Sequence, residues 1–106
     1  MKSYKARELE EALKSHGFLL DRSTSDKIYY LWHGGRKTSV FTKVSHGSGE
    51  GLGHRLMAMI QRQLRLDSQG QLREFIEGTM DGPAYIVFLK AKLVIQDSPG
   101  PTTTRG

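Results

Sequence analysis

The chain has 106 residues, which is enough for one compact domain and excludes a large two-domain enzyme. Cysteine is absent, so disulfides, thiolate metal sites and a cysteine nucleophile are excluded. Lys and Arg outnumber Asp and Glu by 16 to 11, and the excess belongs to residues 1–66, which carry twelve basic side chains and six acidic ones.

The basic character makes a polyanion the natural class of partner. The sequence pI of about 9.7 exceeds the value of ~9 that is typical of a nucleic-acid footprint. Charge alone does not decide the point, because many small proteins are basic without binding RNA or DNA. No apolar run reaches the ~18–20 residues of a membrane span, and the start MKSYKARELEE lacks the apolar stretch of a secretory signal. We therefore expect a cytoplasmic protein.

The first expected element is a helix over residues 4–15. Its apolar residues fall near helical spacing, Ser3 can cap its start, and Gly17 stands where a helix end favours a left-handed residue. Three short strands follow at 18–23, 27–33 and 38–44, each rich in branched or aromatic side chains and separated by polar or glycine-containing turns. Consecutive strands with short turns predict an antiparallel meander.

The second half of the chain is predicted to be helical. Four apolar residues repeat every four positions after the third strand, which is a helix signal: Leu52, Leu56, Ile60 and Leu64. We expect a short helix at 69–77 and another at 84–93, with Pro83 in its permitted first turn. A strand competes for residues 84–95, because their branched and aromatic side chains also favour extended structure. This division gives a domain at 1–66, a helical extension at 67–95 and a disordered tail at 96–106.

The glycine-rich corner in residues 42–64, TKVSHGSGEGLGHRLMAMIQRQL, invites comparison with phosphate-binding loops. A nucleotide P-loop requires a lysine, but none lies between Lys43 and Lys90, and the third glycine of a dinucleotide fingerprint is replaced by Leu52 or His54. Two interpretations remain: backbone N–H groups at the helix start hold one phosphate, or the glycines simply allow a sharp turn.

Four histidines are the side chains that titrate near neutral pH: His16, His33, His46 and His54. His46 is the best candidate for acid–base catalysis, because it leaves a strand end into the glycine-rich corner beside basic residues. His16 is expected on the surface at the end of the first helix. No pair of histidines has metal-ligand spacing, so we predict no metal site and no cofactor.

Arginines of the long helix define a candidate phosphate-binding face. Arg55, Arg62 and Arg65 are spaced by seven and three residues, and Lys43 and Arg36 approach from the neighbouring strand. A solvated helix surface explains the same spacing. Aromatic residues Tyr29, Tyr30 and Trp32 lie along one strand, where half of them are expected to face the core and the other half to stack on a ligand or to lie exposed.

The order helix, three antiparallel strands, helix resembles the HicA toxins, which are small mRNA interferases neutralised by a HicB partner. The resemblance covers roughly residues 5–65 and depends on matching residues at Gly17, Phe18, Arg22, Ile28, Tyr29, Gly35, His46 and Gly53. It implies an α+β fold of the double-stranded-RNA-binding type (α-β-β-β-α), with extra C-terminal helices. It also implies RNA binding, endoribonuclease activity in a toxin–antitoxin system and a HicB-like antitoxin as partner.

One departure from the family concerns catalysis. The family's catalytic histidine belongs to a Gly-Ser-His turn, and this chain has Asp26 at that position. An aspartate is anionic at neutral pH and cannot serve as an imidazolium acid beside a phosphate. Either His46 takes over the proton transfer, or the domain binds RNA or a protein without cleaving. The expected phosphate contacts are Arg22, Lys27, Lys43, Arg55 and Arg62.

Overall fold

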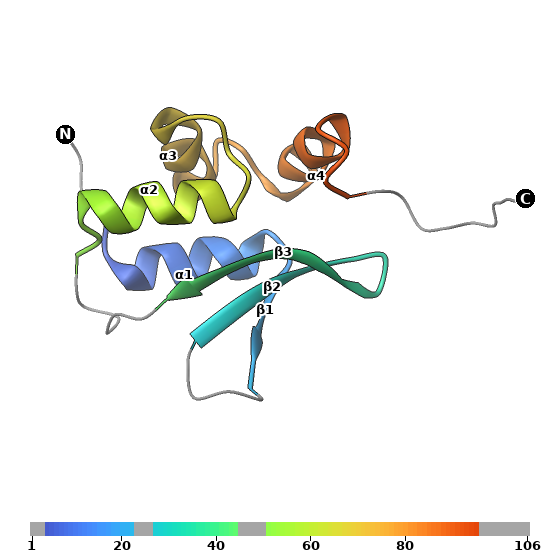
Figure 1. The fold of residues 1–106 in the computed structure, drawn as a ribbon, viewed down its shortest axis with the longest axis horizontal. Coiled ribbons are helices and arrows are strands. Elements are labelled where there is room, and N and C mark those ends of the chain that lie inside the picture. Colours follow the sequence, from blue (N-terminus) through green and yellow to red (C-terminus); the bar gives the residue numbers. More distant parts are fainter. Residues whose placement is uncertain (1–3, 23–26, 45–50, 96–106) are drawn as a thin grey trace, which may run out of the picture.

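The computed structural model describes residues 4–22, 27–44 and 51–95, and these form an α+β fold with one open three-stranded sheet. The elements, in chain order, are α1 (Ala6–Ser15), β1 (Phe18–Asp21), β2 (Lys27–His33), β3 (Arg36–Val44), α2 (His54–Gln63), α3 (Gln69–Glu77) and α4 (Gly82–Ala91). Figure 1 shows the helices on one side of the sheet. No helix in these ranges has the length and apolar character needed to cross a membrane.

The sheet is an antiparallel meander with the order β1-β2-β3, as the sequence predicts. Tyr30 pairs with Phe41, but Trp32 pairs with Lys37, so β3 contains a bulge opposite Leu31. The hydroxyl of Thr38 supports this bulge: it donates to the Leu31 carbonyl at 2.9 Å and accepts from the Val40 N–H at 3.1 Å. The threonine thus replaces hydrogen bonds that the regular ladder loses.

The core lies between the sheet and the helices. Alternate strand residues face it, which is the period of two expected for a half-buried sheet. Helix α1 contributes four buried residues at helical spacing, namely Ala6, Leu9, Ala12 and Leu13. Buried side chains of α3 and α4 belong to the same apolar cluster, among them Leu72, Phe75, Tyr85 and Leu89.

The start of α1 differs from the prediction. The helix begins at Ala6 instead of residue 4, because Lys5 is extended and the Tyr4 carbonyl accepts the Leu52 N–H at 2.8 Å. The adjoining bridge between Lys5 and Gly51 also delays the start of α2 until His54. The buried Tyr4 hydroxyl donates to Glu77, which connects this segment to α3. Ser3, the predicted cap, lies outside the described residues.

Elements β2 and α3 have the predicted bounds, whereas β1, β3 and α4 differ from the prediction by two residues. Strand β3 begins at Arg36, two residues earlier than predicted, and β1 ends at Asp21. The helical interpretation of residues 84–93 is confirmed and the strand alternative is wrong. The Asp81 side chain caps α4 by accepting the Ala84 N–H at 3.0 Å, and Pro83 lies in the first turn. The predicted tail at 96–106 lies outside the described ranges.

His16 is the clearest correction, because it is a core residue and not a surface one. Its side chain is only 4% exposed, and its ring stacks on Phe75 with centroids 3.8 Å apart. The two ring nitrogens lie 2.6 Å and 2.5 Å from the carbonyl oxygens of Ala12 and Met80. His16 therefore ties the end of α1 to the turn before α4.

Candidate nucleic-acid interface

Three predicted phosphate contacts lie at the same end of the sheet. Lys43 pairs with Ile28, one residue from Lys27, and Arg22 directly follows Asp21, which also pairs with Ile28. The antiparallel register alone therefore places the backbones of Arg22, Lys27 and Lys43 close together. We name this end of the molecule, with Arg55 added below, the basic end.

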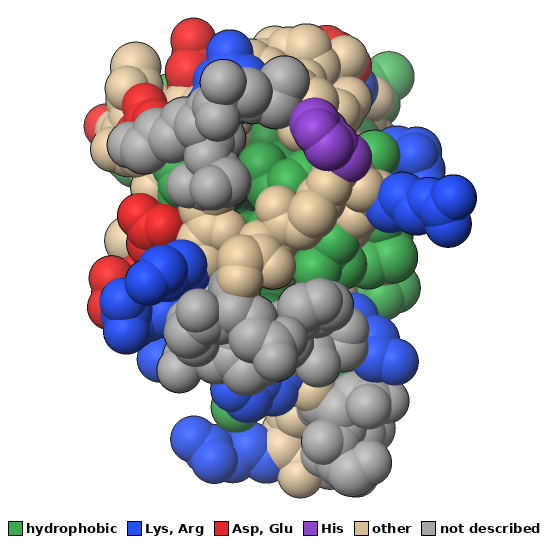
Figure 2. Space-filling model, turned by 90° about the vertical axis from the view of Figure 1, so that its left-hand side faces the viewer, with side chains coloured by type: hydrophobic (Ala, Val, Ile, Leu, Met, Phe, Trp, Pro, Cys, Tyr) green, Lys and Arg blue, Asp and Glu red, His purple; other side chains and the backbone are tan. Residues whose placement is uncertain are grey.

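Arg55 joins this group because α2 begins at the end of the molecule where β3 ends (Figure 1). It is exposed in the first turn of the helix. Figure 2 views this end and shows Lys and Arg side chains around the segments drawn in grey, with Asp and Glu gathered toward one side. The clustering of cations fits a surface that contacts phosphates.

Lys27 is the weakest of these candidates, because it already has an acidic neighbour. Its Nζ lies 3.5 Å from Oε2 of Glu10, whose Oε1 accepts the Tyr29 hydroxyl at 2.7 Å. Burial, and then the hydrogen bond to Glu10, raise the pKa of Tyr29 above its ordinary value. A phosphate at Lys27 would have to compete with the Glu10 carboxylate.

Gln63 fixes α2 to the outer edge of β3. Its Oε1 accepts the Thr42 hydroxyl at 2.6 Å and the Lys43 N–H at 3.3 Å. The Lys43 N–H therefore points away from β2, toward α2, and the backbone of Phe41 is directed the same way because strand residues alternate. This contact holds the last turn of α2 beside β3.

A groove of about 350 Å³ lies where the end of α2 meets β3. It is lined by Ser39, Phe41, Met59, Arg62, Gln63 and Arg65. Arg62 is seven residues from Arg55 on the same helix, which is about two turns or roughly 10 Å. Arg62 lies in this groove, and Lys43 of the basic end contacts the groove through Gln63, so the two sets of cations adjoin.

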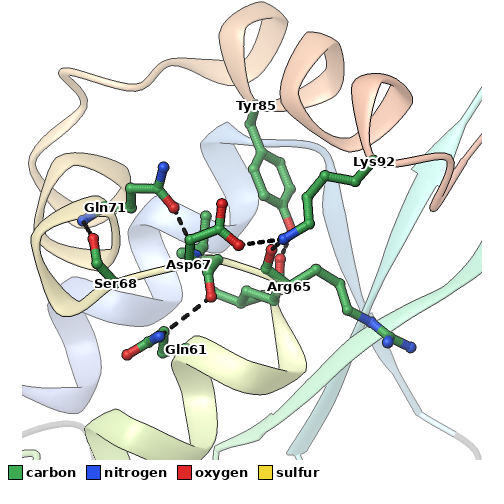
Figure 3. Close-up of polar contacts among 9 residues, drawn as sticks. Gln61, Arg65, Asp67, Ser68, Gln71, Tyr85 and Lys92 are labelled. Atoms are coloured by element: carbon green, nitrogen blue, oxygen red, sulfur yellow. Dashed lines mark hydrogen bonds and ion pairs between the residues drawn. The ribbon is translucent and has the colours of Figure 1, made fainter.

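Arg65 does not belong to the helix as predicted. Helix α2 ends at Gln63, and Arg65 has a left-handed backbone with φ of 65°. Its N–H donates to the Arg62 carbonyl at 3.1 Å, and its own carbonyl accepts the Lys92 ammonium at 3.1 Å. Figure 3 shows this junction, in which Lys92 also pairs with Asp67 and the buried Tyr85 lies beside it.

The candidate catalytic residue His46 and the replaced position Asp26 both lie outside the described residues. His54 is exposed at the start of α2, and His33 ends β2. Within the described ranges, no three His, Cys, Asp or Glu side chains come together in a group that could hold a metal ion.

Exposed aromatic residues on β2 were expected from the sequence, but the contribution of Phe41 from β3 to the same uncovered face was not. Tyr29 is buried against the helices, whereas Trp32 and Phe41 are exposed on the opposite face with the half-buried Tyr30. The alternation of aromatic and other residues in KIYYLWH contained this signal. The pairing of Tyr30 with Phe41 required the sheet register.

Comparison with protein-family models, with curated proteins and with solved structures gives no significant match to this chain. The resemblance to the HicA toxins therefore depends on the residues named in the sequence analysis.

Proposed function

We propose that this chain is a cytoplasmic RNA-binding domain similar to the HicA toxins, in which Arg22, Lys27, Lys43 and Arg55 contact phosphates. The observation that carries the proposal is the sheet register, which places the backbones of Arg22, Lys27 and Lys43 together at one end of the sheet, with Arg55 in the first turn of α2 at the same end of the molecule (Figure 1). The order α1-β1-β2-β3-α2 supports a fold of the double-stranded-RNA-binding type.

Phosphate contacts make affinity fall steeply with salt, so salt dependence is the direct test. Labelled RNA is titrated with the full chain between about 50 and 200 mM salt. We expect the double substitution Lys43→Gln with Arg55→Gln to weaken binding and to reduce the slope of log affinity against log salt by about 0.7–0.9 for each lost contact. Lys14→Gln is the matched control, because it removes an exposed lysine in the last turn of α1, which is not part of the basic end.

RNA cleavage by this domain is an extension of the proposal, with mRNA as substrate, His46 as acid or base and a HicB-like protein as antitoxin. Purified chain and His46→Ala are incubated with RNA under the conditions in which binding is measured. Cleavage by the chain and loss of cleavage in the variant would support it. Intact RNA with both proteins would leave an RNA-binding domain without nuclease activity.

One observation favours a domain that binds RNA or a protein without cleaving RNA. Asp26 stands where the family has its catalytic histidine, and an anionic side chain there would repel the RNA backbone. The domain would then act by binding RNA or a partner protein. A binding curve that does not change with salt would favour the protein partner.

A further inference from the structure

The sheet face opposite the helices carries large apolar side chains that contribute little to the core. Leu19 is 56% exposed, Trp32 41% and Phe41 38%, and no described element covers them (Figure 1). Their strand neighbours Phe18, Leu31 and Val40 are fully buried on the other face. Exposed apolar groups gathered on one face are typical of a binding surface.

The aromatic side chains on this face are adjacent. Tyr30 and Phe41 are cross-strand partners with ring centroids 5.5 Å apart, and Trp32 is two residues from Tyr30 on the same strand. That spacing puts the Trp32 and Tyr30 backbones about 6.5 Å apart on one face. We name Tyr30, Trp32 and Phe41 the aromatic platform.

Positive charge surrounds the aromatic platform. Strand β3 carries three basic side chains, Arg36, Lys37 and Lys43, and β1 carries one acidic side chain, Asp21, whereas Lys27 of β2 pairs with Glu10 of α1 on the covered side. The Nζ of Lys37 lies 4.1 Å from the Tyr30 ring centroid and 4.0 Å from Asp21 Oδ2. Phe41 also lines the groove that contains Arg62 and Arg65, and Lys43 lies two residues from it toward the basic end.

Flat aromatic rings beside cations match a ligand that exposes both flat bases and phosphates. Single-stranded RNA does so, and its bases stack on aromatic side chains with little dependence on sequence. Duplex RNA hides the faces of its bases between neighbouring pairs, so it offers only phosphates and sugars. Aromatic rings on the open sheet face therefore fit single-stranded RNA better than duplex RNA.

We infer that the open sheet face binds single-stranded RNA, with bases stacked on Trp32 and Phe41 and phosphates held by Lys37, Arg62 and Arg65. The inference rests on the proposed RNA-binding function and names its substrate class. The strand of RNA would cross β2 and β3 and continue past Lys43 to the basic end.

Trp32 is the only tryptophan in the chain, so its fluorescence reports on this face alone. The full chain is titrated with a single-stranded oligouridylate and with a blunt RNA duplex of the same length. We expect the single strand to quench Trp32 emission saturably and the duplex to leave it unchanged. Phe41→Ala is expected to weaken binding of the single strand about tenfold. Val87→Ala, which alters an exposed residue of α4, should leave affinity unchanged.

The outcomes separate this inference from the proposed function. Binding of both RNAs, seen by anisotropy, without quenching and without an effect of Phe41→Ala would overturn the inference and retain RNA binding. Absence of binding to either RNA at low salt would overturn the proposed function itself. A Trp32 emission spectrum that shifts with protein concentration and ignores RNA would overturn the inference in favour of contact between two copies. Circular dichroism of Phe41→Ala checks that the variant is folded.

Discussion

The two faces of the sheet carry aromatic side chains for different reasons. On the covered face, Phe18 and Tyr29 are almost fully buried against the helices, and their contribution to stability explains their presence. On the open face, Trp32 and Phe41 are exposed and do not belong to the buried apolar cluster. The stability of the fold accounts for the aromatic residues on the covered face, but it does not account for the exposed ones on the open face, which are typical of a binding surface.

Substituting one phenylalanine on each face gives the largest expected difference. Phe18 contacts Phe75 and Tyr85 and is fully buried, so Phe18→Ala should lower the free energy of unfolding by about 3–5 kcal/mol. Phe41→Ala loses mainly its contact with Tyr30 and should cost about 1 kcal/mol. Urea denaturation followed by circular dichroism measures both. Equal losses would show that the open face also belongs to the core.

Substitutions at the buried His16 and at the exposed His54 test whether a polar side chain stabilises the core. His16→Ala removes the ring contacts to the carbonyls of Ala12 and Met80 and the stack on Phe75. We expect a loss of about 2–3 kcal/mol in the free energy of unfolding. His54→Ala, at an exposed position, should stay within about 0.5 kcal/mol of the wild type. A similar small effect at His16 would argue against its role as a tie between α1 and the turn before α4.

Tyr29 and Tyr30 are consecutive residues that point to opposite faces. Tyr29→Phe removes the hydroxyl that donates to Glu10 and should cost about 1 kcal/mol at neutral pH. Tyr30 lies on the open face, and Tyr30→Phe should change stability by less than about 0.5 kcal/mol. Thermal unfolding of both variants at equal pH provides the comparison.

Alkaline pH tests two buried tyrosines on the covered side of the sheet. Burial raises the pKa of Tyr29 above the ordinary value of 10.0, and burial with the Glu77 hydrogen bond raises the pKa of Tyr4 to about 12. Above about pH 10 the unfolded chain loses these protons while the folded chain keeps them, so the free energy of unfolding falls as pH rises. Tyr4→Phe should make that fall shallower between pH 10 and 12. A fall of the same steepness in the variant would contradict the assignment.

Local patterns were sufficient to predict most of the fold. Period-two alternation and turn residues located the three strands, and four-residue repeats with Pro83 located the helices. The start of α1 was wrong because Tyr4 pairs with a segment almost fifty residues away, which no local pattern contains. His16 was misplaced for the same reason, since Phe75 and Met80 come from the other end of the chain.

The candidate site was less predictable than the fold. Sequence reasoning selected the cations of the basic end by their type, but their proximity follows from the register of β2 with its two neighbours. Arg65 was assigned to the helix, because its left-handed backbone occurs without a glycine to mark the helix end. The aromatic platform combines residues of β2 and β3, and it is exposed because the helices cover only the other face (Figure 1).

The most direct test of the central claim maps bound RNA onto the chain by NMR. Amide chemical shifts of the ¹⁵N-labelled protein are recorded while single-stranded RNA is added at low salt. The account predicts progressive shifts across Lys27–His33, Arg36–Val44 and the first turn of α2, with the amides of α4 unchanged. Spectra that do not change, or shifts confined to α3 and α4, would contradict it.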